Sequence, residues 1–209
     1  MIRNPDPLID SLISQLAPVR PMRLSTGLGR TALSLAAAIG LVVAMLGLRG
    51  DATPLVLLSS GLFLVLGAAA SVTVIMMGRP RVGSEHSGWL WAAAMAALLP
   101  ATTLLMGLIH GPTAWAESDP ATGMACLAMG LLFGLATASV LVAWLRRGAP
   151  TSPARAGLIT GIAAGSFGIF AFSFHCPSND LYHIGVWHSL SVIVAAVIGR
   201  VIVPRLIRW

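Results

Sequence analysis

Residues 121–145 read ATGMACLAMGLLFGLATASVLVAWL, a run without a single charged side chain. A helix that crosses the bilayer core needs ~20 consecutive and mostly apolar residues. Five further stretches are similar in length and composition, at roughly 31–48, 54–78, 88–109, 156–174 and 185–203. The stretch at 88–109 contains Pro100, which neighbouring helices can accommodate in lipid. The sequence therefore predicts an all-α fold, an integral membrane bundle of six transmembrane helices.

The composition of the whole chain excludes an ordinary soluble domain. Apolar residues make up 56% of the 209 positions and charged residues 10%, whereas soluble domains carry roughly 25% charged residues. The net charge of +6 could indicate nucleic-acid binding. However, all thirteen basic residues are arginines, placed singly or in pairs between the apolar stretches, so they form no basic stripe. No direct contact with nucleic acid is expected.

The arginines predict how the chain is oriented in the membrane. If the six spans alternate, twelve arginines fall on one side and only Arg49 falls on the other, together with Asp51, Glu117, Asp119 and Asp180. Basic residues mark the cytoplasmic side of a membrane protein, so both termini are expected in the cytoplasm. The chain then divides into a cytoplasmic segment, 1–30, and a membrane domain, 31–209. The twelve are Arg3, Arg20, Arg23, Arg30, Arg79, Arg81, Arg146, Arg147, Arg155, Arg200, Arg205 and Arg208.

The N-terminal segment contains a pattern typical of a short amphipathic helix over residues 6–16. Asp6 suits the N-cap and Pro7 the first helical position. One face of this helix is apolar. Eleven residues form only a marginally stable helix in water, so the helix needs a surface against which this face can pack. That surface is either the membrane interface or a groove on a soluble partner. Helices that lie in the membrane interface usually carry Lys or Arg on their polar face. This helix has the acidic Asp10 and no basic residue on that face, which favours the partner. The face consists of Leu8, Ile9, Leu12, Ile13 and Leu16.

Glycines recur at four-residue spacing in two of the predicted spans, at Gly157, Gly161 and Gly165 and at Gly130 and Gly134. Small residues at this interval let helix backbones approach closely. We expect this packing inside one bundle rather than in a dedicated dimer interface. Whether the chain forms a homo-oligomer is left open.

Two cysteines, Cys126 and Cys176, fall near the outer ends of consecutive spans. Cys126 lies ~8 Å below the outer surface if its helix begins at residue 121. A disulfide needs Cα atoms within ~7 Å, so pairing and simple packing of Cys126 both stay open. His175, Cys176, His183 and His188 are the candidates for a metal site, but their spacing matches no closed site. On an α-helix His183 and His188 would point about 140° apart, so neither a metal nor a cofactor is expected.

The sequence contains no catalytic constellation: no Ser-His-Asp set, no HExxH motif and no glycine-rich phosphate loop. We therefore do not expect an enzyme. The predicted spans contain no acidic residue, which disfavours proton- or cation-coupled transport. A small membrane transporter and a thiol-redox membrane protein remain the alternative interpretations.

Several segments, in order along the chain, resemble the NrsF family of bacterial membrane anti-sigma factors. These are DPLIDSLISQLAPVRP (6–21), LRRGAP (145–150), His175-Cys176-Pro177, Trp187 and LIRW (206–209). The resemblance implies a multi-pass protein of the bacterial inner membrane, which binds lipid there. It would hold an extracytoplasmic-function sigma factor inactive and release it during oxidative or heavy-metal stress. It also implies that residues 6–21 contact the sigma factor and that Cys126 and Cys176 are the redox sensor.

Overall fold

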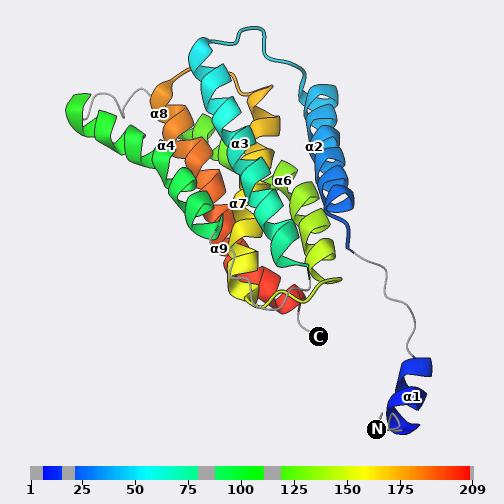
Figure 1. Cartoon of the computed structure of the whole chain (residues 1–209). Helices are drawn as coiled ribbons and strands as arrows, with labels where there is room; N and C mark the ends of the chain where they lie inside the picture. Colours follow the sequence, from blue (N-terminus) through cyan, green and yellow to red (C-terminus); the bar gives the residue numbers. More distant parts are fainter. Residues whose placement is uncertain (1–6, 16–21, 80–87, 111–118, 208–209) are drawn as a thin grey trace.

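The computed structural model describes residues 7–15, 22–79, 88–110 and 119–207. The regular structure in these residues is entirely helical, which confirms the predicted all-α class. Figure 1 shows the long helices packed side by side, with α7 in the middle of the bundle. The elements are α1 (Pro7–Ser14), α2 (Leu24–Leu46), α3 (Pro54–Met77), α4 (Gly88–His110), α6 (Pro120–Leu145), α7 (Pro153–Ser173), α8 (Leu181–His183), the π-helical turn η1 (Ile184–His188) and α9 (Ser189–Leu206).

Within the described residues, five helical segments are long and apolar enough to cross a membrane: α2, α3, α6, α7 and the continuous segment Leu181–Leu206. They match five of the six predicted spans. The largest difference is at the first span, where α2 begins at Leu24 and not at residue 31. The Gly27 N–H already donates to the Arg23 carbonyl. The predicted domain boundary at residue 30 therefore falls inside α2.

The remaining predicted span, 88–109, is helical but differs from the other five. α4 covers it and contains Pro100 inside the helix. Its apolar segment, Ala94–Ile109, is shorter than those of the five candidate spans. Figure 1 shows α4 at the edge of the bundle. A membrane crossing by α4 stays a prediction.

Glycines bring α7 into backbone contact with its neighbours. A Cβ at Gly161 would overlap the Ala195 carbonyl of α9, and one at Gly134 of α6 would lie 2.6 Å from the Ala164 carbonyl oxygen. Gly157 and Gly165 also pack against α9. The prediction that these glycines pack helices within one bundle is confirmed, and α7 is consequently buried on nearly all sides.

The two ends of the bundle differ in chemistry. One end holds the α2–α3 connection, the start of α6 and residues 174–188. There the backbone N–H of Arg49 donates to the Phe174 carbonyl (2.8 Å). We call this the cysteine end. At the other end Trp144 Nε1 donates to the Ile75 carbonyl (3.2 Å). Except for Arg49, the arginines of the described residues lie toward this second end, which we call the arginine end.

The helix α1 (Pro7–Ser14) falls inside the predicted range 6–16. Three residues of its apolar face, Ile9, Leu12 and Ile13, expose 51%, 56% and 60% of their surface. Asp6 and Leu16 lie outside the described residues, as does the side chain of Leu8. The described part of this apolar face is therefore exposed.

Candidate functional site

Four side chains from separate segments meet at the cysteine end. Cys126 lies near the start of α6, Cys176 follows α7, His183 belongs to α8 and His188 ends η1. Each offers a sulfur or ring nitrogen, and these four atoms lie within 4.8 Å of one another. None of the four residues exposes more than 3% of its surface. We call them the cysteine–histidine cluster.

Three of the ligand atoms form a tight triangle. Cys126 Sγ lies 3.5 Å from Cys176 Sγ and 3.2 Å from His183 Nε2. Cys176 Sγ lies 3.7 Å from the same nitrogen. The thiols are free, because their separation far exceeds the ~2.05 Å of a disulfide bond. From the sequence it was undecided whether the two cysteines lie close together. The fold brings their side chains into contact.

The start of α6 fixes Cys126. Asp119 is the N-cap of this helix, and its carboxylate accepts from the backbone N–H groups of Ala121 and Thr122. Hydrogen bonds from the Thr122 hydroxyl and from these two N–H groups lower the pKa of the Asp119 carboxyl. An N-cap of this kind stabilises the first turn of the helix, and Cys126 lies in the turn that follows.

The end of α7 fixes Cys176. The N–H groups of His175 and Cys176 both donate to the Phe172 carbonyl, at 2.9 and 3.1 Å. This tight turn, followed by Pro177, ends the helix and directs the Cys176 side chain toward α6. Hydrogen bonding with the Cys126 thiol lowers the pKa of the Cys176 thiol against the opposing effect of burial, and hydrogen bonding with His183 lowers it further.

The π-helical turn changes where the histidines point. His183 and His188 were expected to point apart, and this expectation is wrong, since their ring centroids lie 5.5 Å apart. A π turn bonds residue i to residue i+5 and widens the helix, so side chains five positions apart come together. Asp180 fixes the start of this segment by accepting from the His183 N–H (2.7 Å).

Two glycines make room around the histidines. A Cβ at Gly123 of α6 would overlap the indole of Trp187, and one at Gly185 would overlap Thr103 of α4. Both positions let η1 approach its neighbours closely. Neither the π turn nor these two close approaches could be predicted from the sequence, because the α-helical pattern of apolar residues does not indicate them.

His175 does not join the cluster. Its Nδ1 lies 3.3 Å from the Gly47 carbonyl, and its ring packs edge-on against Phe172. Three of the four metal-site candidates named from the sequence therefore come together: Cys176, His183 and His188. The fourth member of the cluster is Cys126 and not His175.

Arg49 and Asn179 form a network that the sequence did not predict. Arg49 Nη2 donates to Asn179 Oδ1 (2.6 Å), and Arg49 pairs with Asp51 (3.8 Å). Thr53 also donates to Asn179 Oδ1 (3.2 Å). The α2–α3 connection is thereby tied to the segment that carries Cys176.

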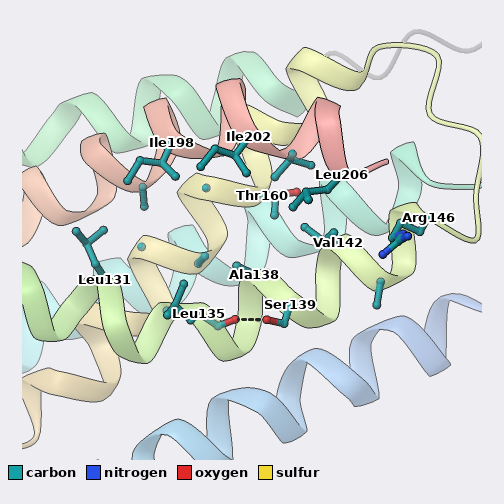
Figure 2. Close-up of a pocket in the computed structure, with 18 residues that line it drawn as sticks. Leu131, Leu135, Ala138, Ser139, Val142, Arg146, Thr160, Ile198, Ile202 and Leu206 are labelled. Atoms are coloured by element: carbon teal, nitrogen blue, oxygen red, sulfur yellow. Dashed lines mark hydrogen bonds between the residues drawn. The ribbon is translucent and has the colours of Figure 1, made fainter. Parts of the chain in front are cut away.

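An apolar groove of about 480 Å³ lies between α6, α7 and α9. Figure 2 shows its walls, with Leu131 and Leu135 on α6, Ile198 and Ile202 on α9, and Arg146 at one end. Arg146 is the only charged residue among those that line it, and none of the cluster residues does so. The groove offers packing surface without reactive groups, so the cluster is the candidate site.

The described residues thus form an all-helical bundle of the kind found in membrane proteins, with five helices long and apolar enough to cross a membrane and a buried cysteine–histidine cluster at one end. The family model "Negative regulator of sigma F" (NrsF) matches residues 12–209, and the chain therefore belongs to the NrsF family. It is 30% identical to the "Anti-sigma-F factor NrsF" of Caulobacter vibrioides (strain NA1000 / CB15N), over 98% of this chain and 99% of that protein. It is 26% identical to the "Probable anti-sigma-F factor NrsF" of Azospira oryzae, over 92% of each. No solved structure matches the chain.

Proposed function

We propose that this protein is an anti-sigma factor of the bacterial inner membrane that holds an extracytoplasmic-function sigma factor inactive. Its family membership over residues 12–209 carries this proposal. The relative from Caulobacter vibrioides is named an anti-sigma-F factor and aligns along nearly its whole length. The role is regulatory and needs no catalytic group.

The distribution of arginines supports an orientation. The arginine end faces the cytoplasm, because cytoplasmic connections carry the excess of basic residues. The cysteine end then faces the periplasm. With α4 as a sixth span, α1 and the C-terminus both lie on the cytoplasmic side, where a sigma factor is found.

The exposed face of α1 is the proposed contact with the sigma factor. Ile9, Leu12 and Ile13 present apolar surface at helical spacing. Burying one such side chain contributes ~1.5–3 kcal/mol before ordering costs. A helix of this size laid in an apolar groove is a common mode of recognition. Leu8 and Leu16 extend the same face in the sequence.

The cysteine end is the proposed sensor. Cys126 and Cys176 are already in contact, and oxidation would join their sulfurs while two electrons pass to the oxidant and two protons are released. A bond between them would tie α6 to the end of α7. The helix α7 packs against α9, α6 and α3 and is in backbone contact with the first two. A shift at this end can therefore reach the arginine end through α7 and its neighbours.

Co-purification tests the central proposal. The full chain, extracted in detergent from its native host, is expected to retain a sigma factor that mass spectrometry identifies. A preparation that is folded and intact yet free of any sigma factor contradicts the proposal. Retention of a transported solute would favour the transporter, and catalysis of thiol exchange would favour the thiol-redox alternative.

A further inference from the structure

We propose that the cysteine–histidine cluster is a four-coordinate site for a thiophilic divalent cation of the Zn²⁺ or Cd²⁺ type. Cys126 and Cys176 supply thiolates, and His183 and His188 supply imidazole nitrogens. Binding of the cation is a property of the folded chain alone. Its coupling to release of a sigma factor rests on the function proposed above.

The distances fit tetrahedral coordination. With Zn–S bonds of ~2.3 Å and Zn–N bonds of ~2.0–2.1 Å, a tetrahedral site separates two sulfurs by ~3.8 Å and a sulfur from a nitrogen by ~3.5 Å. The observed separations are 3.5 Å between the sulfurs and 3.2 and 3.7 Å from them to His183 Nε2. These three ligand atoms therefore already stand at separations close to those of tetrahedral coordination. The His188 nitrogen, which lies within 4.8 Å of each of them, moves toward the cation to complete the site.

The charge balance fits a buried site. Each thiol releases a proton when it binds the metal, so two thiolates and two neutral imidazoles cancel the double positive charge of the cation. A neutral complex is the form that a dry environment tolerates, whereas an unpaired buried thiolate is costly. Soft sulfur ligands and imidazole select Zn²⁺-like cations over Mg²⁺ or Ca²⁺.

His188 supplies an independent observation. Its Nε2 is buried without a hydrogen-bond partner among the described residues. A buried polar atom without a partner is costly, and one of the two ring nitrogens of His188 lies within 4.8 Å of the other three ligand atoms, within reach of a bound cation. The π turn that brings His188 beside His183 also costs regular α-helical bonding, and π turns of this kind occur frequently at functional sites.

The cluster also connects the segments that a sensor would have to move. A bound cation would link the start of α6, the end of α7 and the α8–η1 segment at one point. A disulfide would link only the first two. Metal binding is thus the reaction that uses all four side chains.

Cobalt titration of the purified full-length protein tests the site. In detergent with a non-thiol reductant, Co²⁺ is expected to bind one equivalent. It should show the intense visible bands of tetrahedral coordination and thiolate-to-metal charge transfer, and Zn²⁺ or Cd²⁺ should displace it. His188→Gln and Cys126→Ser should each weaken binding at least about tenfold. The matched control is His175→Gln, which removes a neighbouring imidazole outside the cluster and should bind normally.

A second measurement uses the unaltered protein, in case a variant misfolds. Diamide joins the two thiols and removes two ligands, so Co²⁺ binding should disappear and return after reduction. Octahedral, sulfur-free Co²⁺ spectra, or binding that survives both diamide and the Cys126→Ser, Cys176→Ser double variant, would overturn the proposal. Loss of binding in His175→Gln equal to that in His188→Gln would also overturn the assigned ligand set.

The outcomes separate this inference from the proposed function. A chain that binds a sigma factor but no Co²⁺ overturns the metal site and leaves the anti-sigma role standing. A chain that binds Co²⁺ through the four residues but carries no sigma factor supports the metal site and contradicts the anti-sigma role.

Discussion

Cys126 Sγ and Cys176 Sγ lie 3.5 Å apart, although fifty positions separate the two residues in the sequence. Replacing either residue with serine is therefore expected to abolish the response to diamide or a thiophilic metal, because both reactions need both sulfurs. Basal repression should persist, since no predicted sigma-binding residue is altered. A reporter driven by the sigma factor measures both effects, with immunoblots of the membrane fraction as control. A double variant that still responds fully would contradict the sensor role.

Leu12→Asp is expected to weaken sigma binding at least roughly tenfold, because it loses ~1.5–3 kcal/mol of apolar burial and places a charge in the contact. The regulon should be derepressed while membrane insertion stays normal, as no candidate span is changed. Ser11→Asp is the matched control, since it adds the same charge on the polar face. Co-precipitation from detergent measures both variants. Equal retention of the sigma factor by both would exclude α1 as the contact.

Reporter fusions after Arg81, Thr113, Pro150 and Trp209 test the orientation. Cytoplasmic activity is expected at Arg81, Pro150 and Trp209, and periplasmic activity at Thr113, because the arginine-rich connections stay in the cytoplasm. Cytoplasmic activity at Thr113 would show that α4 does not cross the membrane. Reversal at all four positions would instead mean that the bundle is inverted, with the cysteine end in the cytoplasm.

Gly161→Ala is expected to destabilise the bundle by about 1–3 kcal/mol, because the added methyl group overlaps the backbone of α9. Gly40→Ala adds the same group where nothing lies within 4 Å. It should be neutral or slightly stabilising, since alanine favours helix more than glycine does. Thermal unfolding in detergent compares the two variants. Similar melting temperatures would mean that α7 and α9 can separate without cost.

Most of the helices were predictable from the sequence, because a long helix of this kind is marked by a long stretch of apolar residues. The stretch 121–145 and the helix Pro120–Leu145 differ by one residue, and the spacing of Gly157, Gly161 and Gly165 correctly predicted close packing. The start of α2 was missed because Arg30 suggested a polar boundary, although an arginine near a helix end can extend its side chain to the interface.

The cysteine–histidine cluster was missed because helical periodicity assumes α geometry, and the π turn at Ile184–His188 departs from it. The network of Arg49 depends on Asn179, 130 positions away, a contact that no local pattern encodes.

The pairing of Arg49 with Asn179 also has a consequence for the order of assembly. Arg49 is synthesised with the first hairpin, α2–α3, at a stage when Asp51 is present but Asn179, its other side-chain partner among the described residues, is not. Asn179 is synthesised much later, together with the final hairpin. We therefore expect the guanidinium to stay hydrated until that hairpin is in place, and its side chain to reach its final 8% exposure only then. Closure of this end of the bundle is accordingly expected late in biogenesis, and a chain stalled before residue 179 should leave the Arg49 side chain accessible to water.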